Sequence, residues 1–171
     1  QSFYDAVPGV SIWKIPSFEF SDIKVDKMMN RVAKAPAVII DLRGNGGGLL
    51  DSLVDLVVAF FDKDVKLGKL QYRKKTESAY MKGSGKGAYT GKLVVLVDSE
   101  SSSAAEIFAR IVQIEKRGFV IGDQTSGAVM VSNILPHYQG LDTQIGYAFS
   151  VTVADLIMMD GKSLEKVGVT P

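Results

Sequence analysis

Hydroxyl side chains gather in one short segment, Ser99-Glu-Ser-Ser-Ser103, which follows an apolar run from Leu93 to Val97. A valine-rich run of this kind is typical of a strand buried on both faces of a sheet. From Ser103 onward apolar residues recur every three or four positions, which predicts a helix, and Glu106 completes a capping box with Ser103. A serine there lies beside backbone N–H groups that lack intrahelical acceptors. Its hydroxyl could act as a nucleophile, and the N–H groups could form an oxyanion pocket next to it. On spacing alone, helix capping is the simpler interpretation.

A second turn between a strand and a helix lies upstream and is rich in glycine. The apolar run from Ala37 to Leu42 leads into Arg43-Gly-Asn-Gly-Gly-Gly48, and a helix is expected from about Leu49 to Phe61. Glycines in such a turn let the backbone approach a ligand closely, with N–H groups directed toward it. The glycine spacing does not match a dinucleotide-binding fingerprint, and no Gly-Lys-Ser/Thr follows, so a phosphate-binding loop is rejected.

Composition narrows the classes of protein that this chain can belong to. Its 171 residues, 46% of them hydrophobic and 23% charged, are typical of one globular domain with a full core. The net charge of +1 gives no reason to expect a nucleic-acid or anionic-membrane partner. With no cysteine and one histidine, the sequence predicts no disulfide, no thiol catalysis and no metal site built from cysteine or histidine. No metal and no cofactor are expected. No apolar run is long enough to span a membrane.

The remaining pattern predicts helices and strands in alternation, after an extended lead-in over residues 1–8. Such alternation, with some strands following one another directly, indicates a mixed α/β architecture. The expected elements are a strand at 9–15, a helix from Ser21 or Asp22 to about Lys34, a strand at 69–75, a long mobile hairpin or loop at 76–91, a short buried strand at 118–122, and an antiparallel strand at 145–153.

Three blocks in this order resemble the carboxy-terminal-processing, or tail-specific, serine proteases. They are Asp41-Leu-Arg-Gly-Asn-Gly-Gly-Gly48, Ser102-Ser-Ala-Ala-Glu-Ile107 and Val120-Ile-Gly-Asp-Gln-Thr-Ser-Gly127, and the resemblance extends from about Gly9 to Pro171. The tricorn protease core and the interphotoreceptor retinoid-binding protein belong to the same wider family. The resemblance implies the superhelical ββα fold shared with the crotonases and the caseinolytic protease. It also implies that residues 1–171 are one catalytic core, a segment of a longer protein whose PDZ domain is missing here.

The resemblance further implies a set of site residues. Ser103 would be the nucleophile of an endopeptidase, and Asp41 and Arg43 would brace the glycine-rich loop. Backbone N–H groups of Ala104 and of either Gly47 or Gly48 would form the oxyanion hole, and substrate-binding positions fall on Thr125, Gly127 and Ala128. The implied partner is a polypeptide, bound near its carboxy terminus, and the implied location is periplasmic or otherwise extracytoplasmic.

The general base is the main departure from the family pattern. The family's base is a lysine, kept neutral by desolvation, and its position falls on Ala128, followed by Val129 where the family has glycine. Two adjacent departures favour a natural variant over engineered inactivation. Tricorn-like relatives use a histidine that precedes the serine, whereas His137, expected in a surface loop, follows it.

Three functions therefore stay open. The first is a peptidase of the carboxy-terminal-processing type, with its base supplied from elsewhere. The second is a non-catalytic module that binds a peptide or an apolar ligand in the same cleft. The third, an acyl-thioester enzyme of crotonase type, ranks last because neither Glu106 nor Asp123 is a convincing acid or base.

Overall fold

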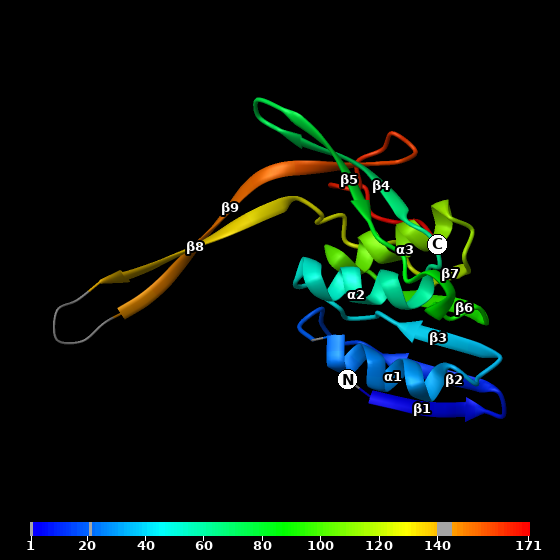
Figure 1. Ribbon diagram of the computed structural model, residues 1–171. Helices are drawn as coiled ribbons and strands as arrows, with labels where there is room; N and C mark the ends of the chain where they lie inside the picture. Colours follow the sequence, from blue (N-terminus) through cyan, green and yellow to red (C-terminus); the bar gives the residue numbers. More distant parts are fainter. Residues whose placement is uncertain (1, 21, 140–144) are drawn as a thin grey trace.

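The computed structural model describes residues 2–20, 22–139 and 145–171, and it confirms a mixed α/β architecture with two sheets (Figure 1). In the first sheet the strands follow the order β1-β2-β3-β6-β7, and in the second β5-β4-β9-β8. The helices are α1 (Asp22–Val32), α2 (Leu50–Phe60) and α3 (Ala104–Ile114), with a short 3-10 turn at Gly85–Gly87. The strands are β1 (Ser2–Val7), β2 (Val10–Lys14), β3 (Ala37–Asp41), β4 (Val65–Tyr72), β5 (Thr76–Met81), β6 (Lys92–Val97), β7 (Phe119–Gly122), β8 (Val131–Gln139) and β9 (Ile145–Met158).

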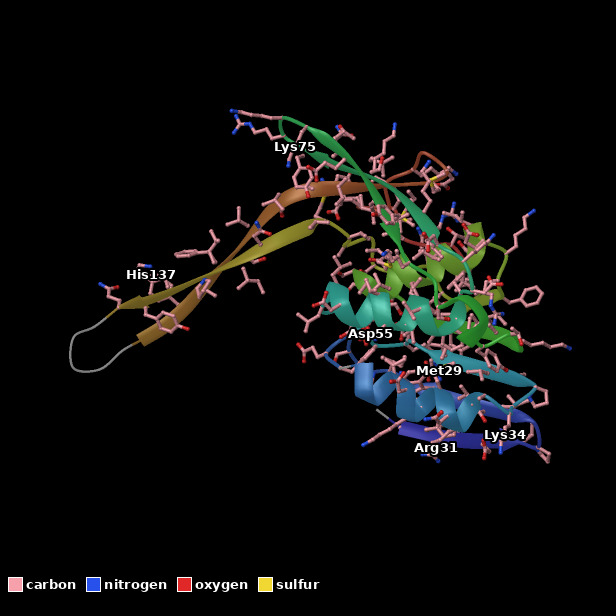
Figure 2. The ribbon with its side chains drawn as sticks, in the orientation of Figure 1. Met29, Arg31, Lys34, Asp55, Lys75 and His137 are labelled. Atoms are coloured by element: carbon pink, nitrogen blue, oxygen red, sulfur yellow. The ribbon has the colours of Figure 1, made fainter. Side chains whose placement is uncertain are left out.

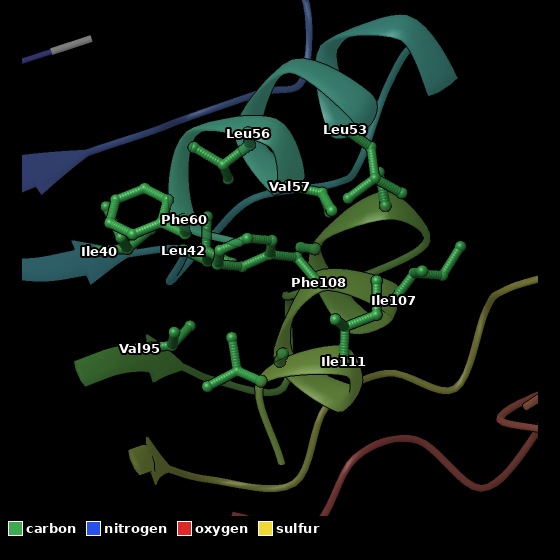
Figure 3. Packing of buried hydrophobic residues seen from close by; sticks show 14 of the residues in the cluster. Ile40, Leu42, Leu53, Leu56, Val57, Phe60, Val95, Ile107, Phe108 and Ile111 are labelled. Atoms are coloured by element: carbon green, nitrogen blue, oxygen red, sulfur yellow. The ribbon is translucent and has the colours of Figure 1, made fainter. Parts of the chain in front are cut away.

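Four parallel strands, β2, β3, β6 and β7, form most of the first sheet, and β1 pairs with β2 in the antiparallel direction. The segment expected to be extended at residues 1–8 is extended over Ser2–Val7, but it is a paired edge strand and not an unpaired lead-in. The core lies between this sheet and helices α2 and α3 (Figure 3). There Phe60 of α2 meets Phe108 of α3 edge to face, with ring centroids 6.2 Å apart, above Ile40 and Val95 of the strands.

The other face of this sheet is less covered than the apolar runs predict. In β6, Val95 is fully buried whereas Val94 is only half-buried, so burial on both faces is wrong for this strand. The short strand expected to be buried at 118–122 is also different. As β7 it pairs only with β6 at the sheet edge, and Phe119 and Ile121 are 75% and 52% exposed.

The second sheet is built on β9, which is long enough to serve two partners. Residues 154–158 of β9 pair with β4, and most of the rest pairs with β8. Residues 131–139 and 145–153, here called the arm, therefore form a two-stranded ribbon that projects from the body (Figure 1). The segment expected as a long mobile hairpin or loop at 76–91 begins with strand β5, which forms a hairpin with the preceding strand β4.

Candidate active site

The glycine-rich loop and the serine-rich turn meet at one edge of the first sheet. Because β3 and β6 are parallel neighbours, the turns that follow them emerge at the same edge. The N–H of Ser102 donates to the Asn45 carbonyl at 2.9 Å, which joins the two turns directly. A Cβ built on Gly47, whose φ is +90°, would lie only 2.6 Å from the Cβ of Ser103. Glycine at 47 therefore permits the close approach that brings the two turns together.

Ser103 has a backbone conformation that L-residues rarely adopt. Its φ of 53° and ψ of −118° occur directly before α3, and its side chain is half-buried. Such a conformation costs about 1–3 kcal/mol and persists only where surrounding contacts enforce it. Here the Ser103 N–H is held by the Glu106 carboxylate and by the Ala128 carbonyl, both at 3.0 Å. The capping box expected between Ser103 and Glu106 is confirmed.

Glu106 is the buried centre of this arrangement. Its side chain is inaccessible to solvent, and both carboxylate oxygens accept two hydrogen bonds each. Oε1 accepts from the Thr125 hydroxyl at 2.6 Å and the Gly127 N–H at 2.8 Å, and Oε2 accepts from the N–H groups of Ser103 and Ala128, both at 3.0 Å. A carboxylate with all its acceptor sites in use is a structural anchor rather than a free base.

A second carboxylate continues the same pattern along the chain. Glu165 Oε2 accepts from the N–H groups of Val129 and Met130, at 2.9 and 3.2 Å. Val129 is buried, whereas Ala128 between these two anchors is exposed. Ala128 thus lies beside Ser103 in space, on a short segment whose backbone is fixed on both sides.

The glycine-rich loop is fixed by a buried asparagine. Asn45 donates from Nδ2 to the Ile15 carbonyl at 2.8 Å and accepts the Gly47 N–H at 2.8 Å. The chain then bridges to Phe18, whose N–H donates to the Gly47 carbonyl and whose carbonyl accepts the Leu49 N–H, both at 2.7 Å. In this bridge the N–H of Gly48 points away from Phe18, and Gly48 is exposed. Within the described residues this N–H donates to no acceptor.

Charged residues brace the loop from its outer side. Arg43 makes two parallel hydrogen bonds to Asp41, both at 2.9 Å, as expected of a brace, and Lys14 also donates to this carboxylate at 3.4 Å. Burial raises the pKa of Asp41, but the hydrogen bonds from Arg43 and the charge of Lys14 outweigh burial and hold that pKa below its ordinary value. Asp98 likewise has a lowered pKa, because the Gly44 N–H and other donors outweigh its burial.

No base accompanies the serine in the described part of the chain. His137 lies in β8, on the arm and away from the body, so it is a surface residue as expected but belongs to a strand and not to a loop (Figure 2). Its ring packs against Tyr147, with centroids 4.9 Å apart. No histidine or lysine is hydrogen-bonded to the Ser103 hydroxyl among the residues described. In the same residues, no group of three or more histidine or acidic side chains is placed to hold a metal ion.

The sequence did not indicate two of the residues that hold this site together. Asn45 lies between glycines, where it suggested only a turn, and Glu165 lies some sixty residues after Ser103 with no local pattern around it. Each acts through contacts between segments that are distant in the sequence.

Comparison with known proteins places the chain in a family. The sequence profile of peptidase family S41 matches residues 10–171, and the chain therefore belongs to this family of serine peptidases. It is 31% identical to the tail-specific protease of Haemophilus influenzae over 97% of its own length and 25% of that protein. It is 26% identical to the carboxy-terminal processing protease CtpA of Bacillus subtilis over its whole length and 36% of that protein. The chain thus spans about a quarter to a third of these relatives.

Solved structures share the fold. A putative peptidase from Parabacteroides merdae superposes with a TM-score of 0.78 at 19% identity, over 99% of this chain and 55% of that one. The photosystem II D1 C-terminal processing protease gives a TM-score of 0.70 at 23% identity, over 95% of this chain and 41% of that one. The tricorn protease gives 0.59 at 19% identity, over 95% of this chain and 15% of that one. The superhelical core expected from the resemblance is confirmed.

Proposed function

We propose that this chain is the catalytic core of a serine peptidase of the carboxy-terminal-processing type, with Ser103 as its nucleophile. The observation that carries the proposal is the φ of 53° at Ser103, a strained serine at the start of α3 in contact with a glycine-rich loop. In a sheet-to-helix turn this conformation presents a hydroxyl beside helix N-terminal N–H groups. Helix capping alone needs no such strain, since capping residues normally adopt extended conformations.

The oxyanion hole in this proposal consists of the N–H groups of Gly48 and Ala104. Neither donates to an acceptor within the described residues, and Ala104 begins α3, where the N–H has no intrahelical partner. Gly47 is less suited to donate, because its own N–H is already bound to Asn45. Its part is to allow close contact with Ser103. Thr125 and Gly127 support the segment that carries Ala128, and Ala128 itself lines the substrate side.

The chemistry requires a proton acceptor. The Ser103 oxygen adds to the carbonyl carbon of the scissile peptide, its proton passes to a base, and the carbonyl oxygen becomes the oxyanion bound by the two N–H groups. The base then protonates the leaving amine, and water hydrolyses the acyl-serine. Ala128 stands where the family has its lysine base. We therefore expect peptide cleavage by this chain to be slower than cleavage by an enzyme with that base, by about 10²–10⁴-fold or more.

The substrate in this proposal is a polypeptide held near its carboxy terminus, and the location is extracytoplasmic. The support for the substrate is similarity to relatives named as carboxy-terminal processing proteases, and the location is carried over from the family resemblance. No described helix is both long and apolar enough to cross a membrane. A binding module without catalysis is the second candidate, favoured by the lack of any described base beside Ser103.

Cleavage of an unstructured protein separates these functions. We expect cleavage by the chain as it stands to be at or near background, and cleavage by Ala128→Lys to rise about 100-fold and to disappear again in Ala128→Lys/Ser103→Ala. Fast cleavage by the unmodified chain that Ser103→Ala abolishes would mean that a base has been overlooked. Cleavage by Ala128→Lys that persists unchanged in Ala128→Lys/Ser103→Ala would contradict the nucleophile.

A further inference from the structure

Large apolar side chains are exposed on both faces of the arm. Leu135 lies opposite Phe149 on one face, and Ile134 and Tyr138 lie on the other. These four side chains are between 51% and 70% exposed, and no described residue of the arm is charged. An antiparallel ribbon in water normally keeps one polar face toward solvent. Apolar side chains on both faces therefore indicate surroundings that cover both sides of the ribbon.

The aromatic side chains of the arm are of the kind found at a lipid–water boundary. Tyr147 contacts Phe149, with ring centroids 5.5 Å apart, and both Tyr147 and Tyr138 are exposed. A tyrosine combines an apolar ring with a hydroxyl that stays hydrated, and tyrosines are enriched at membrane interfaces. The arm thus has the composition of a segment that enters the interfacial region of a bilayer.

A basic turn lies at the root of the arm. The turn is Arg73-Lys74-Lys75, which joins β4 to β5 (Figures 1 and 2). Tyr72, directly before this turn, pairs with Ala154, directly after the arm. One surface pocket is lined by residues 72–75 of the turn together with residues 152–153 of the arm. The most basic turn of the chain and its largest uncharged ribbon therefore adjoin each other.

The net charge of +1 conceals this local excess of positive charge. Five basic residues and one acidic residue fall within residues 65–81, so this hairpin alone carries +4. All five basic side chains are exposed. Lys75 is paired with Glu77 at 2.6 Å, whereas Arg73 and Lys74 form no ion pair within the described residues. Their positive charge is available to an anionic partner.

We propose that the arm docks on a bilayer that contains anionic phospholipids. Its apolar side chains enter the interfacial region, and Arg73 and Lys74 lie near the phosphate groups of the lipids. Burial of apolar area and attraction of basic side chains to anionic headgroups add to each other in such binding. The two outer edges of the ribbon carry unpaired backbone groups, which need water or headgroups as partners. The arm therefore stays at the level of the headgroups and does not cross the hydrocarbon.

A bilayer explains the arm better than a second copy of the chain does. Pro136 lies in the middle of β8 and has no N–H, as is typical of edge strands that are protected from pairing with another strand. A protein packed on one face would leave the apolar side chains of the other face in water. Lipid surrounds both faces and also supplies the negative charge that is complementary to Arg73 and Lys74.

Flotation with vesicles tests the apolar part of the proposal. The vesicles are phosphatidylcholine alone or phosphatidylcholine with about one-third phosphatidylglycerol. The chain should bind the anionic vesicles about 10-fold or more tightly than the neutral ones, and Phe149→Ser should weaken that binding about 10-fold. Phe119→Ser is the matched control, because Phe119 is 75% exposed on β7 of the body, and it should leave binding unchanged.

A second pair of variants tests the charged part. Arg73→Gln/Lys74→Gln should weaken binding to the anionic vesicles about 10- to 30-fold and leave binding to the neutral vesicles unchanged. Lys27→Gln/Lys34→Gln removes the same charge from exposed positions in and after α1, on the body, and should weaken binding less than about 3-fold. Circular dichroism of each variant verifies folding.

The chain has no cysteine, so a single dye can report which part meets the lipid. A nitrobenzoxadiazole dye on Ser150→Cys of the arm should shift its emission to the blue with anionic vesicles. The same dye on Asn30→Cys of α1 should not. Ser103→Ala should bind vesicles as the unmodified chain does, so this test does not depend on the peptidase proposal.

Four results would overturn the inference. They are no binding of the folded chain to either vesicle, equal losses from Phe149→Ser and Phe119→Ser, equal losses from the two double lysine and arginine variants, and a blue shift of the dye on Asn30→Cys but not on Ser150→Cys. A blue shift at Ser150→Cys that grows with protein concentration in the absence of lipid would also overturn it, because a second copy would then cover the arm.

Discussion

The segment around Ser103 and the arm adjoin each other in the chain, yet they are held in opposite ways. Up to Met130, backbone N–H groups are bound by buried or half-buried carboxylates, Glu106 and Glu165. From Val131 the chain enters a ribbon whose described residues, 131–139 and 145–153, include no charged side chain. Exposed apolar residues there include Ile134, Leu135, Tyr138, Phe149 and Val151.

This contrast shows that the segment around Ser103 is held more rigidly than the arm. A catalytic serine must be held within a fraction of an ångström, and carboxylates buried among several N–H donors achieve this. A two-stranded ribbon has only its own cross-strand hydrogen bonds, and by itself it is marginally stable in water. The site should therefore respond strongly to single substitutions and the arm weakly.

Removal of the Glu106 carboxylate is expected to have the largest effect. Glu106→Ala leaves three donors without an acceptor and takes one of two acceptors from the Ser103 N–H, so the free energy of unfolding should fall by about 3–5 kcal/mol. Urea denaturation measures this. Glu77→Ala is the control, since Glu77 forms an exposed ion pair with Lys75, and its loss should cost less than about 0.5 kcal/mol. Similar losses of stability in the two variants would show that the Glu106 carboxylate does not hold the site together.

Contact between the glycine-rich loop and the serine is tested by Gly47→Ala. The new methyl group strains a φ of +90° and meets the Ser103 side chain, so we expect a loss of about 2–4 kcal/mol. Gly161→Ala is a matched control because Gly161 has a φ of +80° with nothing within 4 Å of an added Cβ. It should cost only the backbone strain, about 1 kcal/mol. Equal costs would mean that the close contact with Ser103 is absent.

The brace around the loop should respond to acid. The pKa of Asp41 is lowered in the folded protein, so its ion pair stabilises the fold above the unfolded value of 3.8 and is lost as pH falls through the folded pKa. Thermal stability should therefore decline below about pH 4, and Asp41→Asn should flatten that decline while lowering stability at pH 7. An unchanged acid limb in Asp41→Asn would show that this carboxylate is not a source of the decline.

The smallest effect is expected on the arm. Phe149 is 57% exposed and contacts Tyr147 edge to face at 5.5 Å, so Phe149→Ser should lower the free energy of unfolding by less than about 1 kcal/mol. The free energy of unfolding of both proteins should be measured over a range of protein concentrations, to detect whether another copy of the chain covers the arm. A loss above about 3 kcal/mol would mean that the arm is covered, and a loss that grows with concentration would mean that another copy covers it.

Local sequence patterns predicted the two turns that form the candidate site. The apolar runs before Gly44 and Asp98, with helical periodicity after them, identified a pair of strand-to-helix turns, and the structure joins them at one sheet edge. The capping box at Ser103 was also predictable, because both of its members lie within one helical turn.

What the sequence did not predict depends on contacts between distant segments. Burial on both faces was inferred for Leu93–Val97 because an apolar run does not reveal whether a second layer covers the sheet. Asn45, Glu165 and the Thr125 contact to Glu106 gave no signal, since a polar residue that is satisfied inside the fold resembles a turn residue or a surface residue in the sequence.

The most direct test of the central claim is the acylation rate of Ser103 in Ala128→Lys as a function of pH, measured with a fluorophosphonate reagent. Ala128 is exposed beside Ser103, and its carbonyl already accepts the Ser103 N–H. A lysine there should act as the base, although the buried Val129 that follows limits its room. We predict a faster reaction that rises with an apparent pKa clearly below the usual value of about 10.4 and is absent in Ala128→Lys/Ser103→Ala. A folded Ala128→Lys variant whose labelling equals that of the unmodified chain at every pH would contradict the account.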